Sequence, residues 1–256
     1  MIRAGLCSIT FRALSADEVI DVAAGAGLES IEWGVGDRGH LTPGDVTTAR
    51  RVGERTREAG LVVASLGSYF RCHPGDDVTP LLDSAEAMGA PRIRVWAGEK
   101  GSADTTGDER AGIVSALTDA ATRAADRGVE LALEYHGRTL TDTPESARRL
   151  MEETAHDNVS SYWQPTQGAD DETALAELDI MAPWVSTVHV FSWWPVAERL
   201  RLHDREALWT RAFERVAALP RVTDALLEFV PRDDPALLRE EAETLRSWLH
   251  VAAASD

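Results

Sequence analysis

The chain has 256 residues, with 26 lysines and arginines against 43 aspartates and glutamates, so its formal net charge is −17. An acidic surface repels phosphate backbones and disfavours nucleic acid as a partner. No apolar run approaches the roughly 20 residues of a membrane helix, and the first residues do not read as a secretory signal. Two cysteines are too few for a disulfide scaffold. We therefore expect a cytoplasmic protein with no membrane partner.

Short runs rich in Val, Ile, Leu and aromatic residues recur along the chain and predict β-strands. The segments between them have helical periodicity. Ser15 and Glu18 form a capping box that opens the first predicted helix, and Pro144 opens another. An apolar stripe predicts a helix over residues 108–127, and the last helix is predicted to begin at Asp234. The predicted strands are residues 3–10, 29–33, 61–69, 92–97, 130–136, 160–164, 186–191 and 225–230.

Eight strand candidates, each followed by a helix candidate, predict an α/β fold: a (β/α)8 TIM barrel of about 250 residues. An open doubly wound sheet is the competing fold, but it usually carries a Gly-rich phosphate turn after its first strand. The corresponding segment here is Gly5-Leu-Cys-Ser-Ile-Thr-Phe, which is no such turn. Because no linker divides the chain, residues 1–256 are predicted to form a single barrel domain. The longer insertions are predicted at about 98–107 and 192–204.

The active site of such a barrel lies at the carboxyl ends of its strands. Period-two alternation points Glu134 and His136 into the barrel mouth, and it does the same for His189 and Glu228, while Gln164 ends the sixth strand. Each residue alone has an ordinary structural explanation, but four successive strands in phase favour a metal site. Two carboxylates, an imidazole and an amide oxygen suit Mn²⁺, Mg²⁺ or Co²⁺ and also admit Zn²⁺.

Six short motifs carry a resemblance to a known family, through their order and spacing along the whole chain. They are Gly5-Leu-Cys-Ser-Ile-Thr-Phe, Ile31-Glu32-Trp33, Arg94-Val-Trp96-Ala-Gly98, Leu133-Glu134-Tyr-His136, Val188-His189-Val190 and Leu227-Glu228-Phe229. Together they resemble the xylose-isomerase-like TIM barrels, the sugar phosphate isomerase/epimerase family. That family includes ketose 3-epimerases, hydroxypyruvate isomerases and inosose dehydratases. Its dimers and tetramers leave a homodimer or homotetramer open for this chain.

The metal ligands of that family are Glu, Asp, His and Glu on strands five to eight. Glu134, His189 and Glu228 match them residue by residue, whereas Gln164 stands where the Asp is expected. Gln167 stands where a substrate-binding His often follows. A neutral amide oxygen weakens the attraction for a hard dication, so a barrel that holds its metal poorly or not at all is a live alternative.

The resemblance implies proton transfer beside a carbonyl of a small sugar, polyol or sugar-derived acid. Glu134 and Glu228 would flank the substrate as the catalytic pair, one removing a proton and the other returning it through an enediolate. This implies a metal-dependent isomerase or epimerase. A lyase of the inosose-dehydratase kind is an alternative, and a non-catalytic sugar-binding barrel without metal is another. DNA repair of the endonuclease IV type is disfavoured by the net charge of −17 and the few inward histidines.

Further side chains are candidates for contact with the substrate. Arg94 could anchor substrate oxygens beside Trp96 as a stacking wall, or belong to an ion-pair lattice. His136 could orient the substrate or only hydrogen-bond a ligand carboxylate. Trp193 could cover a sugar ring or pack on the barrel rim. The predicted substrate-binding set is Glu32, Arg94, Trp96, His136, Gln167 and Trp193.

Overall fold

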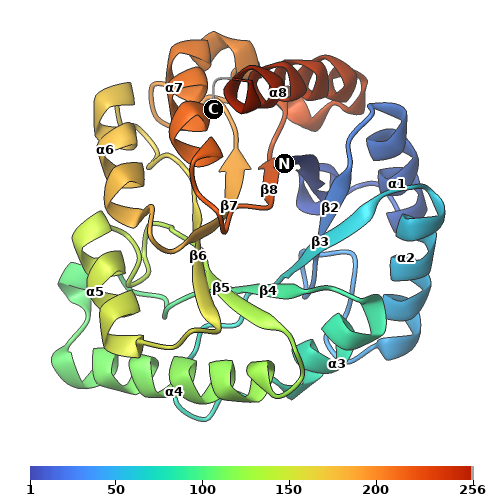
Figure 1. Cartoon of the computed structure of the whole chain (residues 1–256). Helices are drawn as coiled ribbons and strands as arrows, with labels where there is room; N and C mark the ends of the chain where they lie inside the picture. Colours follow the sequence, from blue (N-terminus) through green and yellow to red (C-terminus); the bar gives the residue numbers. More distant parts are fainter. Residues whose placement is uncertain (255–256) are drawn as a thin grey trace.

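A computed structural model describes residues 1–254 of the chain, and the last two residues of the predicted domain lie outside it. Eight parallel strands pair in chain order, and the eighth pairs with the first to close a barrel. The helices form a ring around the strands (Figure 1). The predicted TIM barrel is confirmed. No helix within residues 1–254 combines the length and apolar character that crossing a membrane requires.

The strands are short and the helices that follow them are longer. The strands are β1 (Arg3–Cys7), β2 (Ser30–Gly34), β3 (Val62–Gly67), β4 (Arg92–Val95), β5 (Glu130–Leu133), β6 (Val159–Trp163), β7 (Val185–Val190) and β8 (Asp224–Leu227). The helices are α1 (Ala16–Gly25), α2 (Val46–Glu58), α3 (Thr79–Met88), α4 (Gly107–Ala125), α5 (Pro144–Thr154), α6 (Asp171–Met181), α7 (Glu206–Ala217) and α8 (Leu238–Ala253).

The predicted helix starts follow from local hydrogen bonds. The capping box of Ser15 and Glu18 is present at α1, and Pro144 occupies the first turn of α5. The last helix differs from its prediction. Asp234 accepts a hydrogen bond from a backbone N–H two residues on, which closes a short 3-10 turn over Pro235–Leu237, and α8 begins only at Leu238.

Seven of the eight strands end earlier than the sequence predicted, and β1, β5 and β8 do so by three residues. β1 gives way to a 3-10 turn over Ser8–Phe11, β5 ends before Glu134, and β8 ends before Glu228. The cause after β8 is a change of backbone direction: Phe229 has a φ of 58°, and its N–H donates to the Thr10 hydroxyl at 3.1 Å. His136 therefore lies in a loop and not on a strand.

The amino end of the barrel is joined by a buried carboxylate. Asp224 on β8 accepts two hydrogen bonds from the guanidinium of Arg3 on β1, at 2.9 and 2.6 Å. It also accepts one from the hydroxyl of Ser30 on β2 at 2.7 Å. One side chain thus connects the three strands at which the sheet closes.

We predict that Asp224→Ala lowers the free energy of unfolding by about 2–4 kcal/mol, because it leaves the Arg3 guanidinium and the buried Ser30 hydroxyl without their acceptor. Asp17→Ala is the matched control. The Asp17 side chain is 52% exposed where it pairs with Arg51, so its loss costs less than about 1 kcal/mol. Urea unfolding followed by circular dichroism measures both values, and equal losses would contradict this account of the closure.

Candidate active site

The positions of two glutamates are determined by the ends of β5 and β8. Glu134 is the first residue after β5 and Glu228 the first after β8. Each still donates its backbone N–H to a carbonyl of the neighbouring strand, at 2.9 Å for Glu134 and 3.0 Å for Glu228. Both side chains are therefore fixed at the carboxyl end of the barrel, although neither residue belongs to a strand.

Three of the predicted metal ligands lie around the fourth, His189. The Nδ1 atom of His189, on β7, lies 3.1 Å from Oε1 of Gln164, 3.6 Å from Oε2 of Glu228 and 3.9 Å from Oε1 of Glu134. All four side chains are buried, with at most 7% of their surface exposed. Adjacent ligands of a divalent cation lie about 3 Å apart when the bonds measure about 2.0–2.4 Å. Only the distance from His189 to Gln164 has that value, so the two glutamates would have to move inward to bind a cation together with His189.

The remaining donor atoms of this cluster are in contact with charged groups. Oε2 of Glu134 contacts Nη1 of Arg94, and Nε2 of His189 lies 3.5 Å from Oε1 of Glu32. Carboxylate, imidazole and amide oxygen donors are the types that divalent cations bind, so the chemistry of the donor set fits such a cation, with the amide of Gln164 as its neutral member.

A buried guanidinium lies among these carboxylates. Arg94 on β4 contacts Oε2 of Glu134 through Nη1, and its Nε lies 3.2 Å from Oε1 of Glu32. Burial lowers the pKa of Arg94, but the negative charges of Glu32 and Glu228 raise it above its usual value overall. Of the two predicted roles of Arg94, the ion-pair lattice is present, and the anchor for substrate stays a prediction.

The charged side chains of this cluster have an excess of negative charge, which a divalent cation would neutralise. The single guanidinium of Arg94 is surrounded by the carboxylates of Glu32, Glu134 and Glu228. The formal charge of these four side chains is therefore −3 + 1 = −2. Burial raises the pKa of Glu228 despite the opposing charges of His189 and Arg94. A buried cluster with excess negative charge takes up protons or cations, because desolvation disfavours uncompensated charge.

Glu32 was predicted to bind substrate, but its side chain is almost fully buried. It is 1% exposed and accepts a hydrogen bond from the Ser65 hydroxyl at 2.7 Å. Burial opposes its ionisation, but the charges of Arg94 and His189 and the hydrogen bonds hold the pKa of Glu32 below its usual range. Its binding of a substrate hydroxyl stays a prediction, and the contacts it makes here are with the buried cluster.

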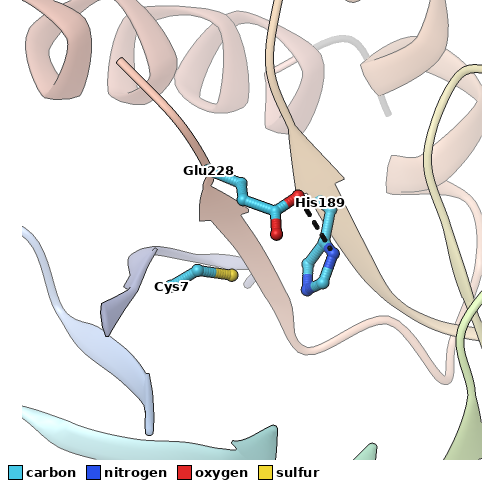
Figure 2. A group of neighbouring side chains, drawn as sticks. All are labelled: Cys7, His189 and Glu228. Atoms are coloured by element: carbon cyan, nitrogen blue, oxygen red, sulfur yellow. Dashed lines mark ion pairs between the residues drawn. The ribbon is translucent and has the colours of Figure 1, made fainter. Parts of the chain in front are cut away.

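Sequence reasoning missed Cys7 as part of this site. The sulfur of Cys7, a ring nitrogen of His189 and a carboxylate oxygen of Glu228 lie within 4.8 Å of one another (Figure 2). Burial and the charges of Glu32 and Glu228 raise the pKa of the Cys7 thiol well above its usual value, and the thiol lies 3.7 Å from Oε1 of Glu32. The period-two phase of β1 turns Cys7 inward with Gly5, and that signal could have placed it.

A cavity of about 600 Å³ opens above the buried cluster. Aromatic rings form part of its wall: the ring centroids of Trp96 and His136 lie 4.4 Å apart, and Trp193 contacts both Phe191 and Phe229. His189 and Glu32 lie below the floor. The predicted site residues that line the cavity are Arg94, Trp96, Glu134, His136, Gln164, Gln167, Trp193 and Glu228.

His136 is a wall residue of this cavity. Its Nδ1 lies 2.7 Å from the carbonyl oxygen of Gly137, and its ring packs on Trp96. Burial lowers the pKa of His136, and the nearby arginines lower it further, so its neutral form is favoured. Its contacts leave it available to a molecule in the cavity, and its role as a substrate ligand stays a prediction.

A family model for the xylose isomerase-like TIM barrel matches residues 20–248. The chain belongs to that family. The resemblance seen in the strand-end motifs is thereby confirmed at the level of the family, which hosts several reactions.

Three relatives span nearly the whole barrel. The chain is 26% identical over 231 residues to a 3-dehydroshikimate dehydratase of Bacillus anthracis, covering 84% of this chain and 80% of that protein. A xylose isomerase-like barrel from Mycobacterium smegmatis in complex with magnesium has a TM-score of 0.75 at 14% identity, covering 99% and 98% of the two chains. The 3-keto-D-glucoside 4-epimerase of E. coli has a TM-score of 0.72 at 18% identity, covering 98% and 100%.

We predict that Gln164→Asp binds Mn²⁺ about tenfold more tightly than the native chain, because a carboxylate replaces a neutral oxygen beside Glu134 and Glu228. Isothermal titration calorimetry measures both affinities. Gln167→Asp is the matched control: it adds the same charge on the same loop, at an exposed position of the cavity wall.

The control variant should bind Mn²⁺ with nearly the native affinity, since a solvated charge is screened. Clear binding by Gln164→Asp together with none by the native chain would mean that the native site does not hold a metal.

Proposed function

We propose that this barrel is a metal-dependent isomerase or epimerase of a small sugar or sugar derivative. The observation that carries the proposal is the placement of two buried glutamates on the floor of one cavity. Glu134 and Glu228 reach that floor from β5 and β8, and oxygens of both lie within 4 Å of the same ring nitrogen. A substrate carbon above that point would lie between two carboxyl groups.

Glu134, Gln164, His189 and Glu228 would hold a divalent cation. Bound there, the cation supplies a Lewis acid for the oxygens of the substrate. The oxygen-rich donor set favours Mn²⁺, Mg²⁺ or Co²⁺, and the imidazole also admits Zn²⁺. The magnesium complex of the Mycobacterium smegmatis relative supports this assignment.

The two glutamates would exchange protons with the substrate. The guanidinium of Arg94 contacts Glu134 and stabilises its carboxylate, the form that accepts a proton from a C–H beside a carbonyl. Loss of that proton gives an enediolate. Glu228, which reaches the floor from the other strand, would return a proton. Returning the proton to the opposite face gives an epimer, and returning it to the neighbouring carbon gives an isomer.

A dehydratase is the second candidate, and the similarity to a 3-dehydroshikimate dehydratase favours it. The first step is the same, because Glu134 removes a proton beside a carbonyl in both reactions. The paths then diverge: a dehydratase expels a hydroxyl group from the adjacent carbon, and Glu228 would protonate that leaving group instead of a carbon. The two reactions can therefore be told apart only by their products.

We predict that Glu134→Gln and Glu228→Gln each lower kcat by about 10²–10⁴-fold, because each amide loses the proton-transfer group and keeps the shape of the side chain. Glu145→Gln, at an exposed position of α5, is the control and should retain native turnover. The assay is ¹H NMR in D₂O with pentoses, hexoses, inososes and sugar-derived acids.

Deuterium incorporation without loss of water identifies the isomerase or epimerase. Loss of a hydroxyl group with a new alkene signal identifies the dehydratase. Native turnover in either glutamine variant would place the chemistry elsewhere, and binding without any turnover by the native chain would mean a sugar-binding barrel.

A further inference from the structure

The charged residues that line the cavity are mostly basic, although the chain as a whole is acidic. The chain carries −17, yet the cavity is lined by four arginines, Arg12, Arg38, Arg94 and Arg138, against three acidic residues. Two of those acids, Glu134 and Glu228, belong to the floor cluster, where Arg94 partly compensates them. The third, Asp142, accepts the backbone N–H of Ser102, from the loop after β4, at 2.9 Å. Three cationic side chains therefore remain at the rim.

None of these three arginines forms an ion pair with a carboxylate among residues 1–254. Most arginines of the chain do form one: Arg51 pairs with Asp17, and Arg211 pairs with Glu172. Arg50 is also unpaired, but it lies on α2 and does not line the cavity. Three unpaired guanidinium groups around one cavity of an acidic chain favour an anion as its ligand.

Arg12 and Arg38 come from the neighbouring loops after β1 and β2. Nε of Arg12 donates to the backbone carbonyl of Arg38 at 3.1 Å, and Nη2 lies 3.4 Å from the hydroxyl of Tyr69. The side chain of Arg38 makes no hydrogen bond or ion pair within the described residues. The two exposed guanidinium groups are thus held on one side of the mouth.

Arg12 is also within electrostatic reach of the floor. Its guanidinium carbon lies 5.6 Å from the ring centroid of Phe229, the residue after Glu228. Because Phe229 follows Glu228 directly, a molecule held by Arg12 at the rim would lie next to the floor that carries the two glutamates.

We propose that the natural substrate carries a carboxylate or phosphate group, which Arg12 and Arg38 bind at the rim while the carbonyl end reaches Glu134 and Glu228. Guanidinium groups bind both anions through paired N–H donors. The indole N–H groups of Trp96 and Trp193, buried without partners in the described chain, face the same cavity and supply donors for hydroxyl groups. This inference rests on the proposed function, because it names the substrate class of the same site.

The test compares ligands that differ in charge and share a carbon skeleton. D-gluconate is paired with D-glucitol, and D-glucose 6-phosphate with D-glucose, so the two pairs separate a carboxylate from a phosphate. Ligand-observed NMR titration gives each Kd with EDTA present, which excludes direct binding of the anion to a metal. The anion of at least one pair should bind about tenfold more tightly than its neutral partner.

The preference should shrink as NaCl rises from about 0.02 to about 0.5 M. Arg12→Gln and Arg38→Gln should each reduce it, and the double variant should abolish it. Arg50→Gln, which removes an exposed arginine on α2 away from the cavity, should leave it unchanged. Equal binding within both pairs, or no detectable binding of either anion, overturns the inference, as does a preference that survives in the double variant.

The outcome separates this inference from the proposed function, because the titration needs neither metal nor turnover. An anion preference that depends on Arg12 and Arg38, found together with native turnover in Glu134→Gln and Glu228→Gln, would refute the proposed chemistry and leave the substrate class standing. The reverse pattern would refute the substrate class alone.

Discussion

The burial of three carboxylates around one guanidinium is the constraint on which this site depends. Charges removed from water are costly unless they are paired, and Arg94 pairs with only part of the charge of Glu32, Glu134 and Glu228. The amide of Gln164 adds no charge of its own. With an aspartate at that position the same cluster would carry −3. With glutamine it carries −2, which equals in magnitude the charge of the divalent cation it would hold.

The inward direction of the candidate ligands could be predicted from the sequence because alternation along a strand is dictated by the pleat. Glu134, His189 and Glu228 each stand out of phase with apolar neighbours, and the structure directs all three inward. The ends of the strands could not be predicted in the same way. They depend on hydrogen bonds between distant loops, such as the one from Phe229 to Thr10, which local propensity does not encode.

Contacts across the barrel were beyond the reach of a linear pattern. Arg94 has the right phase for the interior, but its contact with Glu134 depends on how strands β4 and β5 are staggered. Cys7 has an inward phase too, and only the closure of β1 onto β8 brings it beside Glu228. The absence of carboxylates around the rim arginines, in the part of the chain that the structure covers, is likewise a property of the assembled loops.

The hydroxyl of Thr10 joins the turn after β1 to the loop after β8. It accepts a hydrogen bond from the backbone N–H of Phe229 and lies 3.5 Å from the carbonyl oxygen of Leu227. The turn after β1 therefore contacts the backbone on both sides of Glu228. Arg12 is two residues further along that same turn. The rim arginine and the backbone that carries Glu228 are therefore joined through a single hydroxyl group and a short segment of chain. The spacing between the mouth and the floor of the cavity thus depends on one threonine side chain.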